Sequence, residues 1–265
     1  MRCAAFFDLD KTVIAKSSAL AFGRPFYRNN LITRRDVLKA GYAQLVYLIA
    51  GADEDQMARI RDYLTQLCRG WRVDQVRQIV AETLHELIDP YVYAEAAALI
   101  DQHRAAGRAV FLVSSSGEEI VQPIGQMLGV DGVIATRMVI KDGHYTGEVE
   151  FYAAGPNKAS AVRELAQAEG YDLTESYAYS DSISDVPLLE CVGHPTAVNP
   201  DRALRKVAQE RGWPILTFRH PIPLRQRFAT VRVRTALPLF AAGAAMATVI
   251  GLLWYGRYRR TRVTA

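Results

Sequence analysis

The chain alternates between short apolar runs and amphipathic stretches, a pattern that is typical of α/β proteins. An apolar run that ends abruptly in polar residues predicts a buried strand of a parallel sheet. Such runs occupy residues 4–7, 109–113, 133–136, 176–179, 196–198 and 214–218. Amphipathic or capped stretches predict helices over residues 91–106, 118–128, 158–169, 186–191 and 200–211. Strand and helix in regular succession predict a Rossmann-like parallel sheet, and residues 138–149 predict a β-hairpin turning at Asp142-Gly143.

Residues 13–90 interrupt this rhythm, because they carry helical periodicity and almost no strand signal. Ser17 or Ser18 is placed to cap a helix that runs through Tyr27. Thr33 and Asp36 resemble a capping box for a second helix, which Gly51 ends. Two further amphipathic stretches cover residues 53–67 and 73–87. The pattern therefore predicts an all-helical cap over residues 13–90, inserted into a catalytic core that comprises residues 1–12 and 91–218.

The C-terminal region differs in character from everything before it. Residues 219–235 form a basic linker, residues 236–256 carry no charge, and residues 257–265 form a basic tail. An uncharged stretch of this length suits the hydrocarbon core of a bilayer and predicts a C-terminal transmembrane helix. The alternative is a buried hydrophobic helix. A stripe of small residues at Gly243, Ala247 and Gly251 is compatible with a homodimer.

Charge and cysteine content limit the possible partners and compartment. The 265 residues carry a formal net charge of +4, but nine arginines and no acidic residue follow residue 218. The remainder is slightly acidic, so we expect no nucleic-acid partner. Three separated cysteines have neither disulfide nor metal-ligand spacing. With no signal-peptide pattern, this favours a single-pass protein of the cell membrane with a cytoplasmic catalytic domain.

Polar side chains gather where three predicted core strands end. Asp8, Asp10 and Thr12 follow the first strand, Ser114 and Ser115 follow the second, and Asp181 and Asp185 follow a third. Lys158 begins a helix. Ligands bind at the carboxyl ends of strands in such sheets. Paired carboxylates repel each other, and Mg²⁺ relieves that repulsion. Taken singly, each feature also fits a helix cap, a turn or a solvated lysine.

Together these residues resemble the four motifs of the haloacid dehalogenase superfamily, and the helical insertion resembles that of subfamily IB, which is phosphoserine phosphatase-like. The resemblance implies a magnesium-dependent phosphomonoesterase whose nucleophile is Asp8 and whose general acid and base is Asp10. It implies that the phosphate-binding residues are Thr12, Ser114, Ser115 and Lys158. It implies that the magnesium site comprises Asp8, Asp10 through its backbone carbonyl, Asp181 and Asp185.

Some positions depart from the phosphoserine pattern. Ser17 stands where those enzymes carry a glutamate that binds the substrate ammonium, Ser115-Ser116 replaces two glycines, and Ser184 replaces an asparagine. These departures argue against phosphoserine as substrate. The predicted membrane position favours a phospholipid precursor, and a small phosphorylated metabolite is the alternative. Two alternatives remain open, namely a phosphotransferase of the same family and a non-catalytic, membrane-anchored regulatory protein.

Overall fold

A mixed, mainly parallel sheet forms the centre of the computed structural model, which describes residues 2–33, 65–221 and 223. Within these residues the strand order is β4-β3-β2-β1-β5-β6-β7. Every neighbouring pair is parallel except β3 and β4. The strands are β1 (Ala4–Asp8), β2 (Ala109–Gly117), β3 (Gly132–Lys141), β4 (His144–Phe151), β5 (Tyr177–Ser180), β6 (His194–Val198) and β7 (Ile215–Leu216). The predicted α/β class with a parallel core is therefore confirmed.

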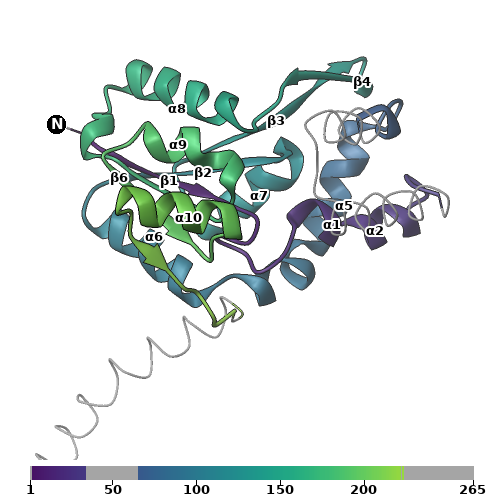
Figure 1. Ribbon diagram of the computed structural model, residues 1–265. Helices are drawn as coiled ribbons and strands as arrows, with labels where there is room; N and C mark the ends of the chain where they lie inside the picture. The colour runs from purple at the N-terminus through teal and green to yellow at the C-terminus, as the bar shows by residue number, and fades with distance from the viewer. Residues whose placement is uncertain (1, 34–64, 222, 224–265) are drawn as a thin grey trace, which may run out of the picture. The chain divides into compact units, whose positions relative to one another are not determined.

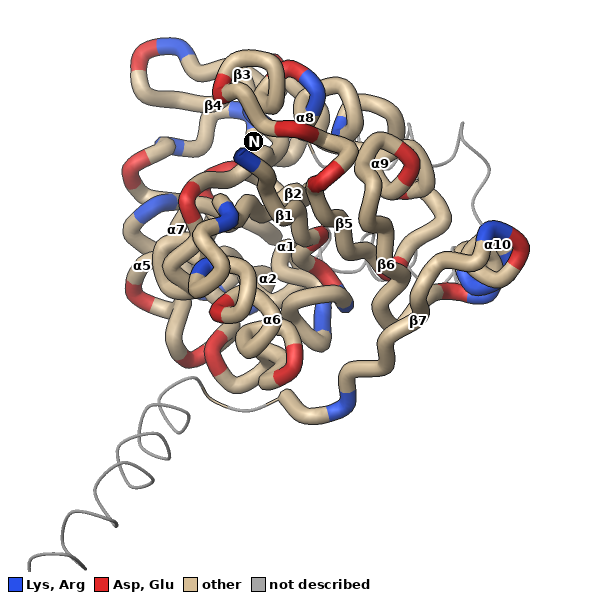
Figure 2. Tube along the Cα trace, turned by 90° about the vertical axis from the view of Figure 1, so that its left-hand side faces the viewer, with Lys and Arg blue, Asp and Glu red and all other residues tan. Residues whose placement is uncertain are grey.

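Helices cover both faces of this sheet, as Figures 1 and 2 show. Those of the core are α6 (Ala94–Ala105), α7 (Glu118–Leu128), α8 (Pro156–Glu169), α9 (Val186–Glu190) and α10 (Arg202–Arg211). Apolar side chains of α8, α9 and α10 share one buried cluster with Phe6 and Phe111 of the sheet. On the other face, α6 contributes His103, whose ring lies 5.8 Å from that of Phe7.

Strand β1 lies in the middle of the sheet, and this explains why its sequence is apolar without interruption. All five of its residues are buried. Phe6 and Phe7 point to opposite faces because side chains alternate along a strand. Phe6 stacks on Phe111, with ring centroids 5.7 Å apart, and Phe7 stacks on Tyr179 at 4.4 Å. Packing on both faces therefore fixes the position of β1 in the sheet, and with it the position of the residues that follow the strand.

The predicted hairpin over residues 138–149 is confirmed by the antiparallel pairing of β3 and β4. Asp142 and Gly143 both have positive φ angles, of 49° and 74°. Positive φ at both central residues is the requirement of a type I′ turn, which asparagine or aspartate followed by glycine meets best. The dipeptide therefore determined the position of the turn.

The described residues of the predicted cap segment include the helices α1 (Ser18–Ala21), α2 (Gly23–Arg28) and α5 (Val73–Leu87). Helix α5 has the predicted bounds, whereas the predicted helix from residue 17 to 27 is divided into two short ones. The second predicted helix and most of the third fall in residues 34–64, outside the described part of the chain. The division into core and cap stays a prediction.

No helix among the described residues is long and apolar enough to cross a membrane. The predicted transmembrane segment, residues 236–256, lies outside the described residues, as do the rest of the linker and the basic tail beyond residue 223.

His103 is a buried histidine with partners on both ring nitrogens. Arg108 Nε lies 2.7 Å from Nδ1 and donates to it, so Nε2 carries the ring proton and donates to the Tyr179 hydroxyl at 2.8 Å. Burial lowers the pKa of His103 to about 4, and Arg108 acts in the same direction. The neutral imidazole is therefore the form that fits between α6 and β5.

We expect His103 to make folding sensitive to acid. In the unfolded chain His103 becomes protonated below about pH 6.5, whereas in the folded protein it stays neutral down to about pH 4. The free energy of unfolding therefore falls as the pH falls through this window. The wild type's advantage in free energy of unfolding over His103→Gln should therefore shrink by about 2 kcal/mol from pH 7 to pH 5. Urea titrations of both proteins at the two pH values measure this difference, and an equal advantage at both would contradict it.

Candidate active site

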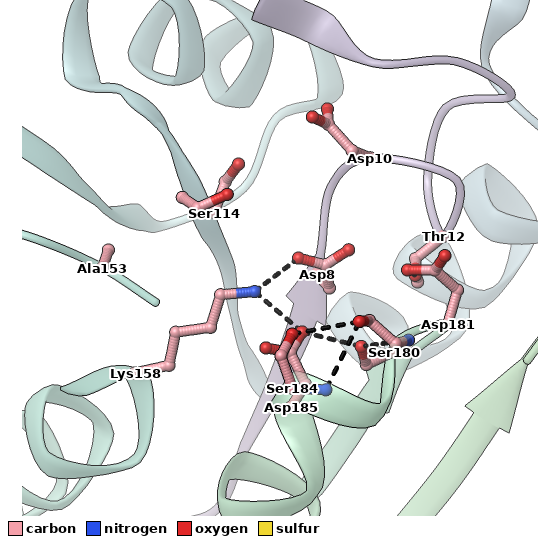
Figure 3. A network of polar contacts seen from close by, with 12 residues as sticks. Asp8, Asp10, Thr12, Ser114, Ala153, Lys158, Ser180, Asp181, Ser184 and Asp185 are labelled. Carbon is pink, nitrogen blue, oxygen red and sulfur yellow. Dashed lines mark hydrogen bonds and ion pairs between the residues drawn. The ribbon is translucent and has the colours of Figure 1, made fainter. Parts of the chain in front are cut away.

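Four elements bring polar side chains together at the carboxyl edge of the sheet (Figure 3). Asp8 is the last residue of β1, Ser114 lies on β2, and Asp181 follows β5 directly. Lys158 lies in the first turn of α8. Each of these four side chains is at least nine-tenths buried. The adjacency of the strand ends, predicted from the sequence, is thus present in the structure.

Lys158 is the centre of an ion-pair network. Its Nζ lies 2.6 Å from Asp8 Oδ1 and 2.7 Å from Asp185 Oδ2. The Ser180 hydroxyl donates to the same Asp185 oxygen at 2.7 Å. The other oxygen, Asp185 Oδ1, is buried and has no hydrogen-bond partner among the described residues. One ammonium therefore serves two buried carboxylates, and one carboxylate oxygen remains unpaired.

At this edge of the sheet, the positive charge of Lys158 does not balance the buried carboxylates of Asp8, Asp181 and Asp185. Burial raises the pKa of Asp8 to about 8; Lys158 opposes the rise, while Asp185 and Asp181 add to it. Burial also raises the pKa of Asp181 to about 6. Burial by itself would lower the pKa of Lys158, but Asp8 and Asp185 outweigh that effect and hold the pKa above its ordinary value. An additional cation beside Asp8 and Asp181 would stabilise the ionised forms.

The loop that follows Asp8 at the end of β1 packs against the loop that carries Asp181. It reverses direction tightly, since the backbone N–H groups of Val13 and Ile14 both donate to the Leu9 carbonyl, at 2.9 and 3.0 Å. Thr12 is fully buried, and its hydroxyl lies 3.5 Å from Asp181 Oδ1. In this structure Thr12 therefore joins two loops of the site.

Asp10 points away from Asp8 and the Lys158 network (Figure 3). Its Oδ1 accepts the backbone N–H of Ser18 at 2.9 Å. Its Oδ2 lies 3.4 Å from the Ser17 hydroxyl and 3.5 Å from that of Ser116. Ser17 occupies the position before α1 but makes no side-chain cap bond there, so its predicted role as a helix cap is wrong. The two aspartates of the motif thus occupy different polar surroundings.

The neighbouring serines on β2 differ in exposure. The Ser114 side chain is buried, and its Oγ accepts the Ser116 backbone N–H at 3.2 Å. Ser115 is exposed, and its carbonyl accepts the Thr136 hydroxyl at 2.8 Å. The side chain of Ser114 therefore belongs to the polar edge, whereas Ser115 contributes a backbone carbonyl that binds the neighbouring strand.

Two polar residues of the site were not predicted from the sequence. The Ser180 hydroxyl donates to Asp185. Asp201 fixes the loop between Ser180 and Asp185. The Asp201 N–H donates to the Asp181 carbonyl at 2.8 Å, and Asp201 Oδ2 accepts the Ile183 N–H at 2.9 Å. Ser180 stands next to Asp181, so its position at a strand end was a usable signal. Asp201 lies within the helix predicted over residues 200–211 and is the N-cap residue of the observed α10, and its contact with the site follows only from the three-dimensional fold.

The described residues contain no cluster of three or more Asp, Glu, His or Cys side chains arranged to hold a metal ion. That finding does not exclude the implied Mg²⁺ site, because only two side chains, those of Asp8 and Asp181, would bind the ion directly, together with the Asp10 backbone carbonyl, while Asp185 would support them. Mg²⁺ prefers oxygen ligands and retains water molecules. The unpaired Asp185 oxygen and the raised pKa of Asp8 and of Asp181 further fit a site that a divalent cation would complete.

Residues 5–190 match the family model described as haloacid dehalogenase-like hydrolase. The chain belongs to this family. Its sequence is 61% identical to the "Inhibition of morphological differentiation protein" of Streptomyces azureus, over 99% of this chain and 96% of that one. It is 55% identical to a "Probable phosphatase" of Mycobacterium tuberculosis, over 98% and 90% of the two chains.

A more distant relative is a protein of Mycobacterium tuberculosis named phosphoserine phosphatase, which is 37% identical over 94% of this chain and 80% of its own length. Among solved structures, a protein of unknown function from Bordetella pertussis superimposes with a TM-score of 0.73 at 29% identity, covering 82% of this chain and 98% of that one. The predicted family resemblance is therefore confirmed.

Replacing Lys158 with methionine should destabilise the protein, because it leaves Asp8 and Asp185 buried without their cation. We expect the free energy of unfolding at pH 7 to fall by about 3 kcal/mol. The loss should be smaller at pH 5, where the Asp8 carboxyl, whose pKa is raised by burial, takes up a proton more readily. Denaturant titrations measure both values. Lys206→Met is the matched control, because Lys206 is exposed and lies 3.8 Å from Glu210. Equal stabilities of the two variants would contradict the prediction.

Proposed function

We propose that the protein is a magnesium-dependent phosphomonoesterase that works through an aspartyl-phosphate on Asp8. The observation that carries the proposal is the buried pairing of Asp8 with Lys158, at 2.6 Å, in a chain of this hydrolase family. A positive group beside the carboxylate can neutralise the charge of an incoming phosphate and of the nucleophile together. Ser114, also buried at this edge, can donate to a phosphoryl oxygen.

The reaction divides into two displacements. In the first, an Asp8 carboxylate oxygen attacks phosphorus, the bond to the substrate oxygen breaks, and Asp10 gives its proton to the departing alcohol. In the second, the Asp10 carboxylate takes a proton from a water molecule, whose oxygen attacks phosphorus. The bond to Asp8 then breaks, and inorganic phosphate leaves. Asp8 and Asp10 return to their starting protonation states, so the cycle consumes one water per monoester.

Mg²⁺ would be held by the side chains of Asp8 and Asp181 and by the backbone carbonyl of Asp10, with Asp185 supporting the set. When bound, it supplies positive charge that stabilises the phosphoryl oxygens in the transition state. Lys158 supplies positive charge in the same sense and is held in place by its bonds to Asp8 and Asp185. Thr12 supports the arrangement by holding the loop that carries Asp10 near Asp181.

The substrate class follows from the first cap segment and from the tail. We propose a phosphomonoester without an ammonium group, either a phospholipid precursor or a small phosphorylated metabolite. The described residues 11–33 contain Lys11, Lys16, Arg24 and Arg28 and no acidic side chain to bind an ammonium. The uncharged residues 236–256 and their arginine-rich flanks support a membrane anchor with the catalytic part in the cytoplasm. A lipid substrate would lie within reach of such an anchored enzyme.

Asp8→Asn should abolish turnover, because the amide is not a nucleophile. With full-length protein, Mg²⁺ and 4-nitrophenyl phosphate, we expect kcat to fall by about a thousandfold or more. Phosphate release over time measures the rate. Asp172→Asn is the control, since Asp172 is half-buried and precedes β5, at the opposite end of that strand from Asp181. Phosphate release by Asp8→Asn at the wild-type rate would overturn the mechanism, and phosphate transfer to an added alcohol would indicate the phosphotransferase alternative.

Asp181→Asn should weaken magnesium binding by about tenfold or more, because an amide oxygen replaces a carboxylate ligand. Isothermal titration of the full-length protein with MgCl₂ at pH 8 measures the affinity directly. Chelation with EDTA should stop phosphate release by the wild type, and added Mg²⁺ should restore it. An unchanged magnesium affinity in Asp181→Asn, with Asp172→Asn alongside, would remove Asp181 from the site.

A further inference from the structure

The Asp10 carboxylate is held by two segments that lie far apart in the sequence. Ser18, the first residue of α1, donates its backbone N–H to Oδ1 at 2.9 Å. Ser116, on β2, directs its hydroxyl at Oδ2 from 3.5 Å. Ser17 adds a third contact at 3.4 Å. The proposed proton donor is therefore oriented by the first turn of the cap segment and by a core strand together.

Ser18 and Ser116 are also bonded to each other. Their hydroxyl oxygens lie 2.8 Å apart, and either one can be the donor. Ser18 is fully buried and Ser116 is 7% exposed. Asp10, Ser18 and Ser116 thus form a closed ring of polar contacts in which each residue touches the other two. Buried polar groups in such a ring fix one another's rotamers, because each would lose a partner if any of them turned.

Orientation matters for Asp10 more than for an ordinary surface carboxylate. Figure 3 shows its carboxylate directed away from Asp8 and Lys158, so the ion-pair network does not hold it. A general acid must point at the departing oxygen, and small displacements of a catalytic group reduce rates strongly. In the described part of the chain, the direction of this carboxylate is set by the backbone N–H of Ser18 and by the hydroxyls of Ser17 and Ser116.

We propose that Ser18 and Ser116 are positioning residues that aim Asp10 at the leaving-group oxygen. The inference rests on the proposed function and extends it to two residues that have no role in the predicted motif set. Because Ser18 begins α1 and Ser116 lies on β2, the contact also makes the aim of Asp10 depend on the docking of that helix against the sheet. Neither serine needs to touch the substrate for this role.

Three variants of the full-length protein separate the contacts. Ser116→Ala removes one hydroxyl from the ring. Ser18→Ala removes the other hydroxyl but retains the N–H, whereas Ser18→Pro removes the N–H as well. Proline is tolerated at the first position of a helix, and Ser17 already has the extended backbone (φ −76°, ψ 124°) that a following proline requires. Comparing the two Ser18 variants isolates the 2.9 Å bond to Asp10.

Ser176→Ala is the matched control. Ser176 is a fully buried serine that accepts the Ala4 N–H at 3.0 Å and donates to the Asp172 carbonyl at 2.6 Å. It precedes β5, at the opposite end of that strand from Asp181. Its loss removes buried hydrogen bonds and costs stability without touching Asp10, so it reports what a merely structural serine contributes.

The readout is the ratio of kcat/KM for phenyl phosphate to kcat/KM for 4-nitrophenyl phosphate. The two esters have similar shapes, but phenol is the weaker acid, so its departure depends more on protonation by Asp10. We expect this ratio to fall about tenfold in Ser116→Ala and Ser18→Pro, less in Ser18→Ala, and not at all in Ser176→Ala. A general loss of folded protein would lower both values equally and leave the ratio unchanged.

An unchanged ratio in both Ser116→Ala and Ser18→Pro would overturn the positioning role, whatever their stabilities. A fall of the same size in Ser176→Ala would overturn it too, since the effect would then be structural. Failure of the proposed function is recognised separately, because Asp8→Asn would then release phosphate from both esters at the wild-type rate. The ratio in the serine variants and the rate of Asp8→Asn are independent measurements.

Discussion

The site depends on one buried ammonium that stands between two buried carboxylates. Transfer of charged groups from water to a protein interior is costly, and it is tolerated only where each charge meets a partner. Lys158 reaches both Asp8 and Asp185 because α8 begins beside the strand ends, with Gly155 at a φ of 53° and Pro156 in its first turn. This contact depends on where α8 begins, on the order of the strands and on the central position of β1. This edge nevertheless carries more carboxylates than cations. A divalent cation would offset the excess negative charge, so that a phosphate could bind beside it.

The fold gives different surroundings to two carboxylates that are separated by one residue. Asp8 ends a strand buried on both faces, so it has no freedom to leave the Lys158 network. The tight reversal after it turns Asp10 toward α1 and β2, where backbone and hydroxyl donors replace the ammonium. Burial raises the pKa of Asp10, and the contacts with Ser18 oppose that rise. A group that can hold and release a proton therefore lies close in sequence to the proposed nucleophile, and the difference between the two comes from their partners rather than from the residue type.

Much of the fold was predictable because the apolar runs of a central sheet are unbroken, and α5 and α7 have the predicted bounds. Strand β2 continues past the predicted end at Val113, since Ser114 and Gly117 still pair with β3. The motif residues followed from their places at strand ends, although their metal and phosphate roles stay predictions. The ring of Asp10, Ser18 and Ser116 was not predictable, because a bond between residues 98 positions apart leaves no periodic signal. His103 was missed for the same reason.

The contact between Ser17 and Asp10 relates the charge of residues 11–33 to the kind of substrate that we propose. A glutamate at this position would present a carboxylate beside Asp10 and attract an ammonium. Ser17 instead directs its hydroxyl at Asp10 from 3.4 Å, so its polar group supports the proposed catalytic acid. The charges that remain in described residues 11–33 are all positive, and Arg24 and Arg28 are exposed. This charge pattern supports the proposed substrate without an ammonium group, because described residues 11–33 offer an ammonium no counter-charge.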